Sequence, residues 1–154
     1  MTPAIVFLKK KKVSFDVHQY QHESDAASFG IEAAQKLGIE QQQVFKTIVL
    51  ETDQKKLIVA IVPVDNQVNL KKLAKACKVK KVVMADKIKV QASTGYILGG
   101  VSPLGQKKRL PTFINETALN YQQIFISAGR RGLEVSLAAN DLSLLLQANF
   151  YDLV

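Results

Sequence analysis

The spacing of apolar residues predicts a chain in which helices and strands follow one another without a strict alternation. Helices are expected where apolar residues recur every three or four positions after a capping residue, and strands where they alternate or run together. The predicted helices cover residues 2–12, 28–37, 70–77, 85–94 and 140–147, with a helical turn at 41–44. The predicted strands cover residues 13–20, 45–51, 56–64, 112–115, 122–127 and 133–138.

Two of the strands show their environment in the pattern. In residues 13–20, Val13, Phe15 and Val17 fall on one face and His18 on the other, as in a half-buried strand. Residues 56–64 are nearly all apolar, which predicts a central strand joined in a hairpin to residues 45–51. These elements favour an α+β fold, with a mixed, mostly antiparallel β-sheet or a small barrel flanked by helices.

The length of 154 residues is most simply one domain, covering residues 1–154, with a core that needs no disulfide. The net charge of +8 favours an anionic partner, of which nucleic acid is the commonest for a basic protein. The charge gathers in four clusters, each of which taken alone also fits a solvated face: Lys9 to Lys12, the lysines between 71 and 81, Lys107 to Arg109, and Arg130 with Arg131.

Cysteine and apolar content predict the compartment. Cys77 is the only cysteine, which excludes an intramolecular disulfide and a cysteine-based zinc site and favours the reducing cytoplasm. The apolar patch near the start is too short for a signal peptide, and its lysines follow it instead of preceding it. No apolar run reaches membrane-spanning length, so no membrane association is expected.

The segment from Ser93 to Pro111 places glycines beside a basic cluster. Six of the eight glycines lie between Gly95 and Gly132. Glycine lets a backbone turn sharply and bring its N–H groups close to an anionic ligand, but it also marks plain bends in hairpins. The order of the glycines fits neither the phosphate loop of nucleotide hydrolases nor the dinucleotide-binding fingerprint.

Other candidate residues each allow two interpretations. Lys46 opens an apolar strand and is either an exposed edge residue or an inward functional group. His18 and His22 share a face without a third ligand nearby, so structural histidines are favoured over a metal pair. Cys77 lies at the end of a lysine-rich helix and is interpreted as a small, partly buried residue instead of a nucleophile. No cofactor is expected.

Several ordered segments resemble the YbaK/EbsC family of aminoacyl-tRNA editing proteins, relatives of the editing domain of bacterial prolyl-tRNA synthetases. The resemblance covers nearly the whole chain, and its ordered set of segments is more specific than any single one. It includes Met1 to Ala4, Tyr20 and Phe29-Gly30, Val44 to Thr47, Leu70 to Lys72, Met84 to Asp86, Ser93 to Tyr96, Gly99 to Arg109, Ser127 to Gly129 and Arg131 to Leu133.

The resemblance implies a set of site residues. The essential lysine of the family's V-[FY]-K-T segment falls on Lys46. The family's G-x-x-x-P loop falls on Gly99, Gly100, Val101, Ser102 and Pro103, whose backbone N–H groups are expected to meet the ester carbonyl or the terminal ribose. Other pocket positions are expected to be Tyr20, Phe29, Thr47, Ser127, Gly129 and Glu134, where relatives often have aspartate at the last position.

The branch that the chain resembles most is the free-standing deacylase that clears cysteine from proline tRNA. Its implied substrate is mischarged tRNA(Pro), its implied partner is prolyl-tRNA synthetase, and the thiol of the substrate cysteine is the implied nucleophile. Such a mechanism gains from holding the thiol against its own carbonyl, an effect worth roughly 7 to 11 kcal/mol when the orientation is good. The alternatives are editing of alanyl-tRNA(Pro) by an activated water, a non-catalytic RNA-binding module, and an inactive pocket protein.

Overall fold

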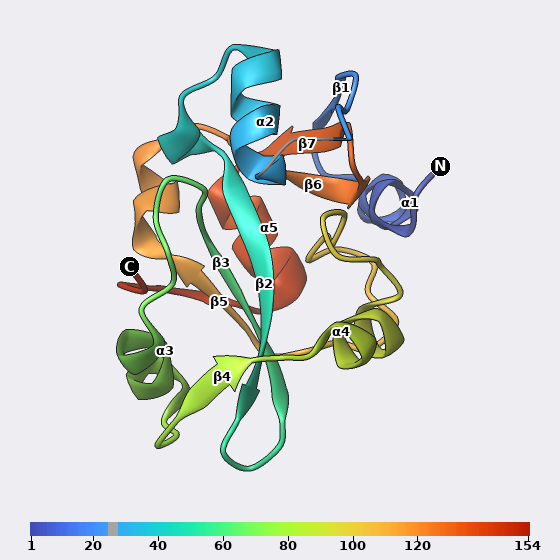
Figure 1. The fold of residues 1–154 in the computed structure, drawn as a ribbon. Coiled ribbons are helices and arrows are strands. Elements are labelled where there is room, and N and C mark those ends of the chain that lie inside the picture. Colours follow the sequence, from blue (N-terminus) through green and yellow to red (C-terminus); the bar gives the residue numbers. More distant parts are fainter. Residues whose placement is uncertain (25–27) are drawn as a thin grey trace.

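The structure is a computed structural model, and it describes residues 1–24 and 28–154. Figure 1 shows the arrangement of the elements. The helices are α1 (Pro3–Lys11), α2 (Phe29–Leu37), α3 (Leu70–Cys77), α4 (Lys87–Thr94) and α5 (Ala139–Leu146), with short 3-10 turns η1 (Gln41–Gln43) and η2 (Glu116–Asn120). The strands are β1 (Asp16–Gln19), β2 (Phe45–Thr52), β3 (Leu57–Pro63), β4 (Val82–Met84), β5 (Thr112–Asn115), β6 (Ile124–Arg130), β7 (Leu133–Leu137) and β8 (Asn149–Tyr151).

The strands form two sheets. One has the order β1-β7-β6 and is antiparallel throughout, and the other has the order β4-β2-β3-β5-β8, in which β5 pairs in parallel with β3 and β8. The predicted α+β fold with a mixed, mostly antiparallel sheet is therefore confirmed. The barrel alternative is wrong, because the two described sheets join through one isolated bridge, Val44 to Phe125, and do not close.

Capping side chains and a glycine define several helix ends. The side chains of Ser28, Asn69 and Asp86 each accept a hydrogen bond from a backbone N–H in the first turn of α2, α3 and α4. Gly38 ends α2 in the left-handed conformation that glycine adopts at little cost. α5 differs, since it starts at Ala139, and Ala138 before it offers no capping side chain.

The main core lies between α1, α5 and the inner faces of the two sheets. The hairpin of β2 and β3 was predicted, and β3 is central, with Ile58 to Val62 buried on both faces. β7 divides its residues between two environments: Leu133, Val135 and Leu137 enter the core, whereas Glu134 and Ser136 face the opposite side.

The structure departs from the sequence pattern at the edges of the sheets. β1 is shorter than residues 13–20, and Val17 is 45% exposed although it shares a face with the buried Val135, because β1 is an edge strand. The three-residue strands β4 and β8, also at the edges, were not predicted. Within the described residues, no helix is long and apolar enough to cross a membrane.

Candidate functional site

A cavity of about 270 Å³ lies where four distant segments of the chain meet. Its walls are the first residues of β2, the first turn of α2, the polar face of the three-stranded sheet and the loop that follows α4. Figure 1 shows this loop, in yellow, lying close to β6 and α1. Small-molecule sites have volumes from about 300 Å³ upward, so this cavity is close to the lower end of that range. A cavity of this size suits a small acyl group.

Strand pairing builds the polar wall of the cavity. Glu134 of β7 lies directly opposite His18 of β1 on one side and Ser127 of β6 on the other, so the three side chains share a face. His18 forms a 2.8 Å hydrogen bond with the hydroxyl of Ser136 and packs on Phe125. The ring of His18 is thus held by protein groups, as a structural histidine is.

Lys46 enters the cavity from the start of β2. Its side chain is half-buried, and burial lowers the pKa of its ammonium group, while the charge of Asp65 acts in the opposite direction. Of its two interpretations, the inward functional group fits this placement, since the amine lines a cavity.

Glu134 is the buried acid of the site. It is only 6% exposed, and burial raises the pKa of its carboxyl group to about 8. Tyr20 stands nearby, and burial, then the charge of Glu134, raises the pKa of its phenol to about 12. Near neutral pH a large share of Glu134 is therefore protonated, and a cationic ligand would favour its charged form.

The hydroxyl of Thr47 has no hydrogen-bond partner among residues 1–24 and 28–154. Its oxygen is buried and makes no hydrogen bond within the described part of the chain, although Thr47 lines the cavity. A buried hydroxyl without a partner costs free energy that a ligand can return by bonding to it. The cavity thus offers an amine, a carboxyl group and an unused hydroxyl.

The glycine loop supplies one wall through Leu98, Gly99 and Val101. The N–H of Gly100 donates to the carbonyl of Ile97 and is already used within a turn. Neither Gly99 nor Val101 donates its N–H to another backbone group among the described residues. Because Gly99 and Val101 line the cavity, their N–H groups, and not that of Gly100, are the candidates for binding a ligand.

Most of the expected site residues meet at this cavity. The structure places eight of the twelve on its walls: Tyr20, Phe29, Lys46, Thr47, Gly99, Val101, Ser127 and Glu134. Four lie outside the lining. Gly100 contacts the backbone of Arg130, the Ser102 hydroxyl accepts from Leu104 N–H, Pro103 borders a second cavity beside α1, and Gly129 packs on Tyr96.

Several lining residues were not predicted from the sequence: Ser28, Gly30, Phe45, Ile48, Leu98, Arg130 and Arg131. The two arginines were noted only as a basic cluster, and their placement after a strand was the signal that could have linked them to the site. The apolar members carried no signal, because nothing in their local pattern separates a cavity wall from a core position.

The described residues contain no cluster of three potential metal ligands. The ring of His22 lies 2.7 Å from the carboxylate of the buried Glu32, whereas the ring of His18 bonds to Ser136. Cys77 packs beside the apolar residues between α3 and the five-stranded sheet, and it is absent from the cavity lining. Burial raises the pKa of its thiol.

Comparisons with known proteins agree on one group. The model of the aminoacyl-tRNA editing domain matches residues 23–145. A protein of Enterococcus faecalis (strain ATCC 700802 / V583), named "Putative Cys-tRNA(Pro)/Cys-tRNA(Cys) deacylase EbsC", is 37% identical over 152 residues, which are 99% of this chain and 92% of that protein.

Solved structures share the fold. A structure described as "a putative trans-editing enzyme for prolyl tRNA synthetase" has a TM-score of 0.87 at 23% identity, over 98% of this chain and 94% of that one. The structure of hypothetical protein APE2540 also has a TM-score of 0.87, at 19% identity, over 98% of each chain. At these identities the likeness shows the fold alone.

Proposed function

This chain belongs to the aminoacyl-tRNA editing domain family, and we propose that it removes cysteine wrongly attached to tRNA(Pro), with the substrate thiol as nucleophile. Its activity as an aminoacyl-tRNA deacylase follows from the family and from the relative that is named as a deacylase. The name of that relative also supports the cysteine substrate and the proline tRNA.

The observation that carries the mechanism is the make-up of the cavity lining. It includes hydroxyl groups, Lys46 and Glu134, but no histidine or cysteine among the described residues. Serine needs an adjacent base to attack an ester, and the hydroxyl of Ser127 instead accepts a hydrogen bond from the N–H of Gly129. A cavity of this kind suits a substrate that brings its own nucleophile.

Cysteine esters carry such a nucleophile. The thiolate sulfur attacks the ester carbonyl, a carbon–sulfur bond forms, and the bond between that carbon and the ribose oxygen breaks. The ribose oxygen takes a proton and leaves as the free tRNA end, and water then opens the cyclic thioester to give free cysteine. Holding sulfur and carbonyl together supplies most of the acceleration.

Lys46 and the glycine loop would support the charge that develops. The ammonium group of Lys46 stabilises either the thiolate or the negative carbonyl oxygen, an effect worth roughly 3 to 4 kcal/mol for one well-placed donor. The N–H groups of Gly99 and Val101 are the second source of donors. Glu134 of β7, which lines the same cavity, would bind the α-ammonium group of the amino acid.

We expect this protein and a partner protein to recognise the tRNA together. Lysine and arginine contacts to phosphates give affinity without reading sequence. A chain of 154 residues has little surface for distant identity elements of a tRNA, so prolyl-tRNA synthetase is the proposed partner that selects it.

A second candidate is the editing of alanyl-tRNA(Pro) by water. The buried carboxyl group of Glu134 favours it, because a pKa of about 8 suits a general base near neutral pH. The two candidates differ in what they require of the substrate, since alanine has no side-chain nucleophile.

The test is a comparison of deacylation rates for cysteine, serine and alanine on the same tRNA(Pro). The substrate-thiol mechanism requires cysteine to be removed much faster than the other two, because a hydroxyl is a far poorer nucleophile. Equal rates would contradict it and support activated water. Replacing the cysteine thiol by a methylthio group, which cannot form a thiolate, should abolish hydrolysis.

A further inference from the structure

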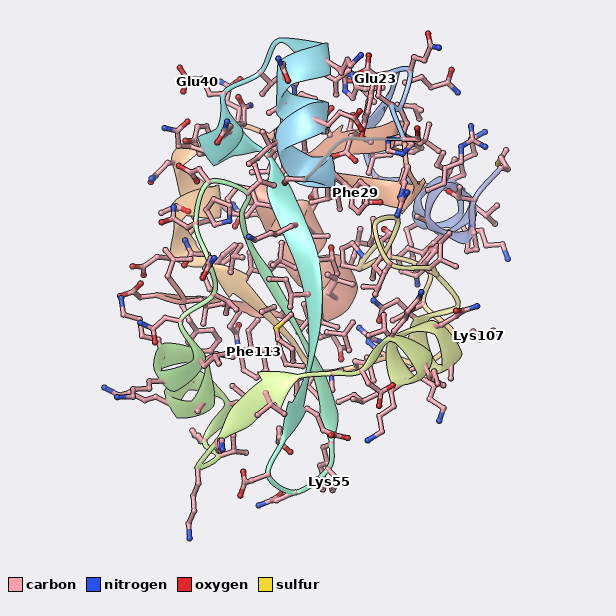
Figure 2. All side chains as sticks on the ribbon, in the orientation of Figure 1. Glu23, Phe29, Glu40, Lys55, Lys107 and Phe113 are labelled. Carbon is pink, nitrogen blue, oxygen red and sulfur yellow. The ribbon has the colours of Figure 1, made fainter. Side chains whose placement is uncertain are left out.

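Arg131 is fixed at the mouth of the cavity by two contacts from other parts of the chain. Its guanidinium carbon lies 3.9 Å from the centre of the Phe29 ring, in the first turn of α2. One of its terminal nitrogens donates to the carbonyl of Leu98 in the glycine loop, at 3.4 Å. Figure 2 shows Phe29 at the end of α2 that faces this loop.

Gly99 makes room for this arrangement. A Cβ atom at position 99 would lie 2.6 Å from Nε of Arg131 and 2.7 Å from the ring of Phe29, and the backbone there has a φ of +89°. With a larger residue at this position, the guanidinium, the ring or the loop itself would have to shift. The stack therefore depends on a glycine that the sequence places in the loop.

The guanidinium keeps most of its hydrogen-bonding capacity. Arg131 is exposed and forms no ion pair with any described residue, and only its bond to Leu98 is used. Glu134, the acid inside the same cavity, does not pair with it. A flat, stacked guanidinium with free N–H groups has the geometry that binds a phosphate through two parallel hydrogen bonds.

The proposed substrate carries a phosphate close to its ester, which Arg131 could bind. The ester is carried by the ribose of the terminal adenosine, and the nearest phosphate is the one on the 5′ oxygen of that ribose. If the acyl group binds beside Lys46, the ribose and its phosphate would extend outward toward the exposed Arg131, which lines the same cavity. We infer that Arg131, stacked on Phe29, binds the phosphate of the terminal nucleotide and so positions the ester.

This inference rests on the proposed function, and small substrates test it separately. Two substrates differ only in the phosphate: cysteine esterified to the ribose of adenosine 5′-monophosphate carries it, and cysteine esterified to the ribose of adenosine does not. The wild-type protein should hydrolyse the first with a kcat/KM about 10- to 100-fold higher, as expected for a charge-assisted hydrogen bond. Arg131→Ala should remove that preference by lowering kcat/KM for the monophosphate ester far more than for the adenosine ester, whereas Arg131→Lys should keep part of it.

Two further variants separate binding from folding. Phe29→Leu keeps the arginine but removes the ring beneath it, and should lower the preference without abolishing it. Lys75→Ala removes one exposed positive charge on α3, away from the cavity lining, and should leave the preference intact. Thermal unfolding of each variant shows whether its fold is retained.

The outcomes distinguish a failure of the inference about Arg131 from a failure of the proposed function. An equal loss on both esters in Arg131→Ala, or no phosphate preference in the wild type, overturns the inference. The affinities of free adenosine 5′-monophosphate and adenosine give a second measure that needs no hydrolysis. If the wild type binds the monophosphate better and Arg131→Ala does not, the inference holds even where no cysteine ester is cleaved, and only the proposed function fails.

Discussion

Lys46 and Glu134 line the same cavity but do not form an ion pair. The pKa of Lys46 is lowered by burial, with Asp65 as the acid that opposes the shift, and the pKa of Glu134 is raised by burial alone. In a direct ion pair, the charge of each group would be compensated by the other group instead of by a ligand. Kept apart, the amine remains available to a carbonyl oxygen or thiolate, and the carboxyl group to an ammonium ion.

Replacing Lys46 by alanine should reduce deacylation strongly. The loss of one preorganised donor typically costs about 100- to 1,000-fold in kcat. Single-turnover hydrolysis of cysteinyl-tRNA(Pro) measures the effect. The matched control is Lys56→Ala, which removes an exposed lysine at the other end of the same hairpin. A folded Lys46→Ala protein with the full rate would remove Lys46 from the mechanism.

Glu134 should make the protein less stable as the pH rises. Its pKa in the folded state is about 8, above the ordinary value of 4.5, so between these values the unfolded chain binds fewer protons than the folded one. Stability is then highest at low pH and is lost as the pH rises through about 8. Glu134→Gln, which carries no charge, should escape this loss, on the order of a few kcal/mol.

Urea unfolding at several pH values between 5 and 9 tests this expectation. The control is Glu40→Gln, an exposed carboxylate that is labelled in Figure 2 and should leave the pH dependence unchanged. Identical pH profiles for the wild type and Glu134→Gln would show that the carboxyl group is ionised and solvated in the folded protein.

Gly99→Ala should impair catalysis more than folding. The new methyl group would meet both Arg131 and Phe29, so the loop or the stack must shift at the mouth of the cavity. We expect kcat/KM for charged tRNA to fall about 10-fold or more, by loss of a charged hydrogen bond. Gly38→Ala is the control, because it also has a positive φ, +69°, but meets no atom within 4 Å.

The two glycine variants should therefore differ in activity. Gly38→Ala carries the backbone cost of a left-handed residue, about 1 kcal/mol, and should lower the melting temperature without changing kcat/KM. Equal activity losses in both variants would mean that backbone strain, and not the crowded stack, is responsible.

The basic cluster next to the glycine loop should contribute more to tRNA binding than the cluster on α3. Lys107 and Lys108 are held against the end of α4 by hydrogen bonds from their N–H groups, on the same loop that borders the cavity. In Figure 1, α3 lies at the opposite edge from α1 and this loop. Lysines on α3 are therefore expected to be largely a solvated face.

Salt dependence separates the two clusters. Changing both Lys107 and Lys108 to alanine should reduce the slope of log affinity against log salt by about two. The matched pair Lys71 and Lys75 on α3, both exposed, should leave the slope nearly unchanged when replaced. A larger change from the α3 pair would place the tRNA on the other side of the molecule.

Local signals in the sequence predicted most of the elements, and distant contacts explain what was missed. The helices α2, α3 and α4, with their capping side chains, and the apolar run of β3 depend on neighbouring residues, and these elements were predicted. The strands β4 and β8 have three residues each and exist because a longer strand offers them an edge. No local pattern encodes that pairing.

The candidate site shows the same division. The family resemblance selected Lys46, Thr47 and Glu134, and the structure brings them to one cavity. It could not show that the N–H of Gly100 is used within a turn, or that Arg131 lies on Phe29, because both depend on how the loop folds back. A run of loop residues in one motif does not put every member on the cavity wall.

The two faces of β7 separate the packing of the hydrophobic core from the lining of the cavity. Its core-facing residues, Leu133, Val135 and Leu137, hold the sheet, whereas Glu134 between them lines the cavity. In evolution or in design, we therefore expect a change at position 134 or at its cross-strand neighbour 127 to alter the amino acid that the proposed site accepts while the hydrophobic packing stays intact.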